Sequence, residues 1–529
     1  MPEDSANNVA GNQNKKSFLN PLLILVFVLL ILIVAGALIY FVRNQNTNTQ
    51  KQVQSIEKEK IRLGWGALTG VYPKNSSPPT TDDTNVNDAV FEALTKVRGS
   101  TVVPSLATKW TNPSSTVWRF EIRKGVKFQT GQTLTADDVK YSFDQVLATV
   151  DDDNPWPSAN SVSTIKAVTV VDPNTVEIET TDPDPILLNR ITDVFIISKS
   201  QVTADGLDKA SGTGPFKVSS YEIDKKAVLV RNDTYWGTKP KVKEADFTAY
   251  QSDQEMLDAI KKGDIDYAKV SLANISVPAN YSVEKHDQPR VEMLFFNYAA
   301  KTLNGKPNPL LNKNVRLAVK DALDNNKLIK EASVSATAAN QFLTRTIVGY
   351  NSSITDSVYS VSKSKTLLTD AGVANLNFSI YTTGEREPTA NAISKQLALA
   401  GITAKVVVLE TFGDVVKKLI SGEAPAFVAG PSATDGGEYI GSIFKTDADQ
   451  NILSYSNATV DKKVEEANAS FSPKERRALL ESLSQTIVDD VPVVPLYADS
   501  ANYIIRKDFS FQVNSLVDFI LESVSGKSP

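Results

Sequence analysis

The sequence predicts a multidomain α/β protein that follows one N-terminal membrane helix, and three segments support this. Residues 376–435 alternate strand and helix, residues 94–205 combine strands with a helix in a mixed α+β unit, and residues 22–42 form an uncharged apolar run. At about 150 residues per domain, the 529 residues have room for roughly three domains with large cores.

The apolar run from Leu22 to Val42 has the length of a bilayer-spanning helix. Its 21 residues would rise about 31 Å as a helix, which matches a hydrocarbon core of roughly 30 Å. Lys15 and Lys16 precede it and Arg43 follows it. The positive-inside rule therefore modestly favours a cytoplasmic N-terminus and places the large remainder outside the cytoplasm.

The alternative for this run is a cleaved signal peptide, because Ala35-Gly36-Ala37 has the small residues of a processing site. The apolar run continues past that site, whereas signal-peptide apolar regions usually have about 7–15 residues. We therefore expect a cytoplasmic tail at 1–17, a transmembrane anchor at 18–43 and a polar, solvated linker at 44–59.

The mixed unit begins with a strand whose faces alternate. Trp118, Phe120 and Ile122 alternate with charged residues, as in a half-buried strand. Thr135-x-x-Asp138 resembles a capping box at the start of an amphipathic helix. The alternating segments on either side of residues 172–174 predict a strand pair joined by a tight turn.

The segment 376–435 predicts a parallel sheet. Strands are expected at 376–381, 402–409 and 426–429, with helices at 391–400 and 411–422. Such β-α-β-α-β crossovers are right-handed, and open α/β sheets bind ligands outside the carboxyl ends of their strands. The candidate ligand loops are therefore 382–388, 410–412 and 430–438.

These loops carry complementary side chains. Arg386 offers a cation, Phe412 an aromatic face and Asp435 an anion, with Glu438 close behind in the third loop. Such a set suits a zwitterion with an apolar body.

Composition excludes several chemistries. The chain has no Cys and His286 is its one His, which excludes disulfides, Cys/His zinc sites and Cys nucleophiles. The formal charge of −5 with interspersed signs argues against nucleic acid as a partner. Gly-x-Ser-x-Gly, His-Glu-x-x-His and phosphate-loop motifs do not occur in the sequence, so we expect a protein that is not an enzyme and needs no cofactor.

Two short motifs need weighing. Ser360-x-x-Lys363 matches a pattern of penicillin-binding enzymes, but its usual partner motifs do not accompany it. Asp447-x-Asp449-x-Asn451 begins like a calcium loop, although Ile452 stands where that loop needs Gly. We therefore interpret the first as a polar helix start and the second as a solvated turn, and we expect no metal site.

A series of sequence blocks resembles the peptide-binding proteins of ABC importers, the family 5 type of extracytoplasmic solute-binding proteins. The blocks are 104–110 (PSLATKW), 118–128 (WRFEIRKGVKF), 131–139 (GQTLTADDV), 212–216 (GTGPF), 231–236 (RNDTYW), 263–266 (GDID) and 314–318 (NVRLA). Each block is weak alone, but together they follow the family's order over nearly all of 85–510.

The resemblance implies a periplasmic-binding-protein-like α/β fold (type II, cluster C). Two lobes close on the ligand, and an extra α+β lobe is inserted into the first. The implied boundaries are lobe I at 60–93, 206–281 and 493–529, lobe II at 94–205 and lobe III at 282–492.

The resemblance also implies ligand-binding residues. In peptide binders of this family an Asp after a Gly-Trp pair holds the ligand's α-amino group. Here Pro431 replaces the Trp, which leaves Asp435 as the candidate and Glu438 as its alternative. Arg386 resembles the Arg that binds the α-carboxylate in dipeptide binders, unless the neighbouring glutamates neutralise it at the surface. Phe412 stands where the family often has a pocket Trp.

The resulting expectation is a monomeric, single-pass membrane protein whose extracytoplasmic domain captures peptides. It would deliver them to the permease subunits of an ABC transporter. Two alternatives remain open: the same fold binds a nickel chelate, haem, a sugar or an opine, or it serves as a surface sensor or adhesion module without transport. A carboxylate-dependent hydrolase is disfavoured because no nucleophile or metal motif supports it.

Overall fold

The computed structural model describes residues 55–68, 70–72, 81–98, 101–150, 156, 158–355, 358–514 and 519–527. They belong to one unit, Ser55–Pro529. The expected tail at 1–17, the anchor at 18–43 and most of the linker at 44–59 lie outside the described residues. Within the described ranges, every helix is too short or too polar to cross a bilayer.

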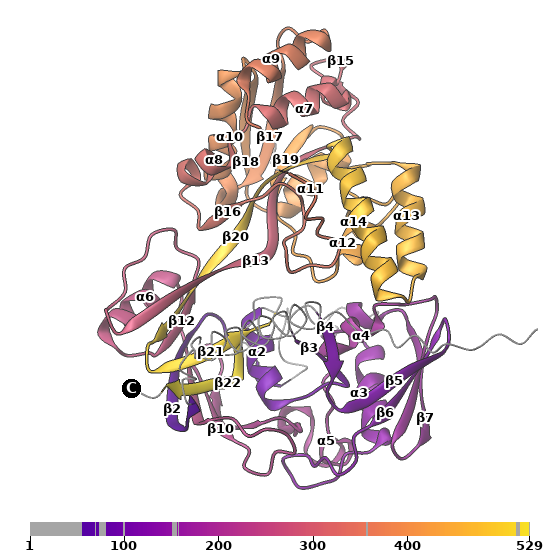
Figure 1. Cartoon of the computed structure of the whole chain (residues 1–529), viewed down its shortest axis with the longest axis vertical. Coiled ribbons are helices and arrows are strands. Elements are labelled where there is room, and N and C mark those ends of the chain that lie inside the picture. Colours follow the sequence, from indigo (N-terminus) through magenta and orange to yellow (C-terminus); the bar gives the residue numbers. More distant parts are fainter. Residues whose placement is uncertain are drawn as a thin grey trace, which may run out of the picture. The chain divides into compact units, whose positions relative to one another are not determined.

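Two long antiparallel strands, β13 (Tyr281–Phe296) and β20 (Val493–Arg506), hold the main sheet together. The sheet order is β18-β17-β19-β13-β20-β12-β2-β11-β10-β9, so these two strands link its two sides. Figure 1 shows both strands running between the two groups of elements. Their pairing is interrupted between Asp287 and Val291. We call β13 and β20 the hinge strands, because two crossing strands with a break in register are suited to bending.

On one side, which we call the β17 half, the predicted β-α-β-α-β unit is confirmed. Its elements in chain order are β17 (Asn377–Thr383), α10 (Glu387–Leu399), β18 (Thr403–Leu409), α11 (Phe412–Ile420) and β19 (Ala426–Ala429). Strand β17 pairs in parallel with both β18 and β19. Thr411 begins α11 by accepting a hydrogen bond from the Asp414 amide at 3.2 Å.

Further helices cover this half. They are α7 (Lys313–Asp321), α8 (Asn325–Ala332), α9 (Val361–Asp370), α12 (Gly436–Ile443), α13 (Ala458–Ala469) and α14 (Pro473–Asp490), with the short strand β16 (Ala336–Ala338) on β20. Ser360 caps α9 by accepting from the Lys363 amide, so this Ser-x-x-Lys pattern is a helix start, as interpreted. Ser472 caps α14 in the same way.

The other side of the main sheet, the β2 half, mixes parallel and antiparallel pairs. Its strands are β2 (Lys58–Trp65), β9 (Phe216–Glu222), β10 (Lys226–Arg231), β11 (Val242–Ala249) and β12 (Tyr267–Val270). Helix α6 (Asp253–Lys262) runs from its Ser252 cap to Gly263 at φ 76°. Smaller elements here include α2 (Thr81–Val90), β3 (Thr95–Arg98), β4 (Thr101–Pro104), β1 (Ser55–Ile56), β21 (Phe509–Val513) and β22 (Phe519–Lys527). Helix α5 (Lys199–Asp205) packs instead against the helix at 136–147.

The predicted mixed unit is also confirmed. A sheet of order β5-β6-β8-β7, the small sheet, contains β5 (Ala107–Ser114), β6 (Val117–Ile122), β7 (Ile165–Asp172) and β8 (Thr175–Thr180). Trp118, Phe120 and Ile122 are buried, as their alternation indicates. Thr135 and Asp138 form the expected capping box at α3 (Ala136–Leu147).

Candidate ligand site

Two of the three predicted ligand loops meet beside the hinge strands. The loop after β17 forms a short 3-10 turn, Gly384–Arg386, and the loop after β19 begins at Gly430. Arg386 Nε donates to Glu292 Oε1 on β13 at 2.6 Å, and Ser432 forms an isolated backbone bridge with Arg290 on β13. The carboxyl ends of the parallel strands therefore lie next to hinge strand β13.

Five charged side chains gather there: Arg290, Glu292, Glu385, Arg386 and Asp499, which we call the hinge cluster. Glu292 is 2% exposed and receives Arg386 on one oxygen and Arg290 Nη2 on the other, at 3.3 Å. Arg290 Nε also lies 3.2 Å from Asp499 Oδ2 on β20. The cluster thus connects both hinge strands with the β17 loop.

The positive charge of Arg386 is therefore already balanced by the Glu292 carboxylate. Its side chain is 17% exposed and also lies 3.4 Å from the Glu385 carboxylate. The sequence raised neutralisation by flanking glutamates as the alternative to a ligand role. Glu292, which is remote in the chain, supplies the shorter ion pair, and nothing in the local sequence indicates it.

Burial perturbs the acid on the second hinge strand. Desolvation raises the pKa of Asp499 to about 6, against the opposing effect of Arg290. Neighbouring carboxylates of Glu292 and Glu385 act in the same direction as burial, whereas Arg386 opposes it. Asp499 is therefore the hinge-cluster group that titrates closest to neutral pH among those with a resolved shift.

Close packing explains the glycine that opens the third loop. A Cβ on Gly430 would collide with the Glu292 carboxylate and lie 3.0 Å from Arg290 Nε. Only a residue without a side chain lets the loop backbone approach the cluster this closely.

Asp435 caps α12 and is fully engaged within the protein. Its Oδ1 accepts from the amides of Gly437 at 2.8 Å and Glu438 at 3.1 Å. Arg476 of α14 binds both carboxylate oxygens, at 2.8 and 2.5 Å, and both side chains are buried. The predicted partner of a ligand amine thus already holds a guanidinium, a pairing that sequence reasoning missed.

Glu438, the alternative acid, is the more accessible one. Its side chain is 41% exposed, and its nearest cation is Arg190, whose Nη2 lies 3.5 Å from Oε1. Arg190 ends α4 (Leu187–Arg190), which follows the small sheet in the chain, and its Nε lies 3.6 Å from Asp184. Burial raises the pKa of Glu438, and Arg190 partly offsets this rise.

A second contact joins the small sheet to the β17 half. The rings of Trp118 on β6 and Phe471, just before α14, lie 5.8 Å apart. Trp118 Nε1 also donates to the Asp184 carbonyl at 3.3 Å, which ties this contact to the Arg190 region. Glu438 therefore lies where the small sheet approaches the β17 half.

Phe412, the predicted aromatic, begins α11 and is 43% exposed. Its ring lies 6.4 Å from that of Phe427 on β19, which stacks on Phe295 of β13 at 4.7 Å. The three rings form a row from the surface to a hinge strand. Phe412 thus offers an apolar face at the second predicted loop, 410–412.

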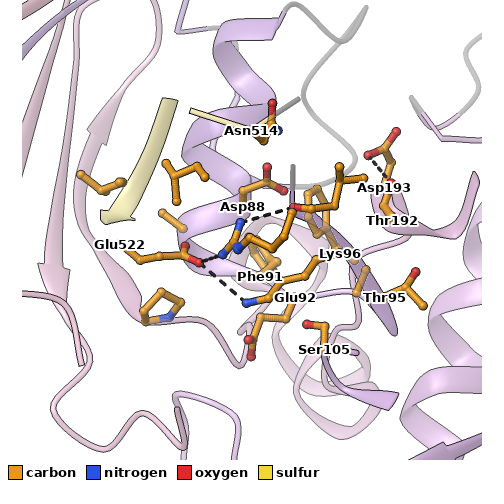
Figure 2. A pocket seen from close by; sticks show the side chains of 18 of the residues that line it. Asp88, Phe91, Glu92, Thr95, Lys96, Ser105, Thr192, Asp193, Asn514 and Glu522 are labelled. Atoms are coloured by element: carbon orange, nitrogen blue, oxygen red, sulfur yellow. Dashed lines mark hydrogen bonds and ion pairs between the residues drawn. The ribbon is translucent and has the colours of Figure 1, made fainter. Parts of the chain in front are cut away.

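A separate cavity of about 220 Å³ lies in the β2 half, lined by α2, β3 and β22. Figure 2 shows Glu522 facing Lys96 across it, and Glu522 also pairs with Arg98. Glu92 beneath it accepts hydrogen bonds from Tyr235 and other buried donors. The four predicted ligand residues are not among its lining residues, so it is distinct from the hinge site.

Comparisons with known proteins agree with this architecture. The family model described as bacterial extracellular solute-binding proteins, family 5 Middle, matches residues 101–451. The dipeptide-binding protein of Escherichia coli (strain K12) is 26% identical over 522 residues, covering 88% of this chain and 94% of that protein. The nickel-binding periplasmic protein of the same strain is 27% identical over 331 residues, covering 60% and 62%.

A solved structure shows the same fold. The putative peptide binding protein AppA from Clostridium difficile superposes with a TM-score of 0.76 at 21% identity, covering 89% of this chain and 100% of that chain. The expected two-lobed α/β fold of periplasmic binding proteins is thus confirmed for the described residues. The relatives named here are all described as binding proteins, for a dipeptide, for nickel or for a peptide. The chain belongs to the bacterial extracellular solute-binding proteins of family 5.

Proposed function

We propose that this protein captures peptides outside the cytoplasm and delivers them to the permease of an ABC importer. The observation that carries the proposal is the meeting of the ligand loops at a two-strand hinge. Loops 382–388 and 430–438 both contact β13, so a ligand held there would touch the elements that bend. Ligand contacts at a hinge can favour a closed arrangement of the two halves.

Each predicted residue has a role in this proposal. Glu438 is accessible and faces the ligand's amine, and Phe412 supplies an apolar wall. Asp435 and Arg386 act as positioning residues, because Arg476 and Glu292 hold them in place. Extended peptide backbone would pair with exposed main-chain groups in the manner of an added strand, which tolerates many sequences.

We further propose that residues 18–43 anchor the protein in the membrane and that residues 44–54 form the linker to the binding domain, since residues 55–56 and 58–59 of the expected linker belong to β1 and β2. The 21-residue uncharged run supports the anchor. Tethering would keep the loaded protein close to its permease and raise the effective concentration for delivery.

Native mass spectrometry of residues 44–529 tests peptide capture. Gently purified protein should carry a ladder of added masses that match short peptides, and partial denaturation followed by refolding should remove them. A protein that carries no added mass, and is not stabilised by a peptide library after refolding, would contradict the proposal.

A non-peptide ligand is the second candidate, because the chain also resembles a nickel-binding periplasmic protein. The same measurement separates the two. One reproducible non-peptide mass, or one that shifts with added nickel and a chelator, would favour this candidate over peptides.

A further inference from the structure

The proposed ligand site is bordered by two ion-pair networks, and each has one more carboxylate than guanidinium. The hinge cluster sets Glu292, Glu385 and Asp499 against Arg290 and Arg386. A second network, the α12 cluster, sets three acids against two guanidiniums. Its members are Asp184, Asp435, Glu438, Arg190 and Arg476. With every group ionised, each network has a net charge of −1.

One loop joins the two networks. The segment from Gly430 to Glu438 begins against Arg290 and Glu292, and it ends at the start of α12. A ligand lying along this segment would therefore meet both surplus charges. Since much of each network is buried, these charges are less screened than charges on an open surface.

The most exposed side chains of the two networks are acidic, although Arg290 at 29% is about as exposed as Asp499. In the α12 cluster, Asp435 and Arg476 neutralise each other in the interior, which leaves Glu438, 41% exposed, facing a 19% exposed Arg190. In the hinge cluster, Glu385 is 70% exposed and Asp499 is 30% exposed, whereas Glu292 is covered. The described side chains of these networks thus present more negative than positive charge to a ligand.

A buried hydroxyl group provides an independent observation. The hydroxyl of Tyr439 is buried without a hydrogen-bond partner, whereas the buried Nε atoms of Arg190 and Arg290 lie 3.6 and 3.2 Å from the carboxylates of Asp184 and Asp499. Tyr439 follows Glu438 on α12, is 5% exposed and interacts electrostatically with Glu292, so it lies by both networks. Buried polar groups without partners are rare, and donors at a binding site are suited to the carbonyl oxygens of a peptide.

We infer that this site selects peptides that carry net positive charge, with Glu438 and Asp499 balancing the ligand's cationic groups. A carbonyl oxygen of the same peptide would accept a hydrogen bond from the Tyr439 hydroxyl. An acidic peptide would add to the surplus negative charge, and a peptide with balanced charges would leave it in place. The inference rests on the proposed peptide function and names the ligand class for it.

The test compares matched tri- and pentapeptides of alanine that carry a central Lys, Gln or Glu. Isothermal titration calorimetry at about 20 mM salt should give the Lys peptide a dissociation constant about tenfold lower than that of the Glu peptide. The value for the Gln peptide should lie between them. The difference should shrink at about 500 mM salt, because salt screens the partly exposed carboxylates.

Glu438→Gln should reduce the Lys-over-Glu preference, while Glu466→Gln should leave it unchanged. Glu466 is the matched control, since it lies on α13 of the same half with a similar exposure of 46% and the same charge is removed. The salt series on the unmodified protein needs no variant, so the test stands even if Glu438→Gln fails to fold.

The outcomes separate the two proposals. Peptides that bind equally well whatever their charge, or a preference for the Glu peptide, would overturn the charge inference and leave peptide capture intact. Binding by none of the peptides, in a protein whose circular dichroism shows it folded, would instead count against the peptide function itself.

Discussion

At the scale of single residues, the site is defined by which charges are already paired. Arg386 and Asp435 were predicted from their positions in loops, and both do lie at the expected edge of the sheet. Their partners Glu292 and Arg476 come from distant parts of the chain. A local pattern can place a charged residue in a loop, but it cannot show whether the fold supplies a counter-ion.

Asp499 provides a prediction about pH and stability. Its pKa rises from an ordinary 3.8 to about 6 through burial, so the folded protein holds a proton between about pH 4 and 6 that the unfolded chain has lost. Stability from this group is therefore present below pH 4 and declines as pH rises to 6. The wild-type free energy of unfolding, minus that of Asp499→Asn, should fall by roughly 2 kcal/mol from pH 4 to pH 7.

Urea unfolding of both proteins across this pH range checks that expectation. The difference between the two proteins cancels the other titrating groups. A difference that stays constant, or that grows with pH, would mean that the ion pair with Arg290 outweighs the burial of Asp499.

At the scale of secondary-structure elements, the sequence was most informative at helix starts. Thr135 and Thr411 each begin a helix as predicted, because cap residues act on the next three residues of their own chain. The two glycines at the start of α12 had no such local reason. Their small size is required by Arg476 and by the Val348 carbonyl, which approach from outside the helix.

At one glycine of helix α12, side-chain packing and helix propensity predict opposite effects of the same substitution on stability. A Cβ on Gly437 would collide with the Arg476 guanidinium, so Gly437→Ala should destabilise the protein by about 1–3 kcal/mol. On propensity alone the same change would stabilise the helix by about 0.5–1 kcal/mol.

Gly441→Ala is the control on the same helix, because its Cβ would make an ordinary contact of 3.4 Å with Val464. It should be neutral or stabilising in thermal unfolding. In an Arg476→Met background, which itself loses the ion pair with Asp435, adding Gly437→Ala should cost little further stability. Equal effects of the two alanines would show that Arg476 does not dictate the glycine.

At the scale of the whole binding domain, the sequence predicts the fold class but not which two strands form the hinge. The β-α-β-α-β segment and the small sheet follow from periodicity and turns within 60 to 110 residues of chain. The pairing of β13 with β20 joins segments about two hundred residues apart, and the periodicity of either strand does not indicate its partner. The contact between Arg190 and Glu438 is equally non-local.

The hinge makes the central claim measurable, namely that the β2 and β17 halves close on a ligand held between them. Because the chain has no Cys, two introduced cysteines can carry spin labels without background. Ser220 on β9 and Lys405 on β18 are exposed residues on the two outermost strands of the main sheet.

The most direct test measures the distance between these labels by pulsed electron–electron double resonance, with and without a saturating Ala-Lys-Ala peptide. We expect the label distance to shorten when the peptide binds, while a pair at Lys405 and Glu466, both in the β17 half, stays unchanged. A peptide that binds by calorimetry and leaves the distance between Ser220 and Lys405 unaltered would contradict closure around the ligand.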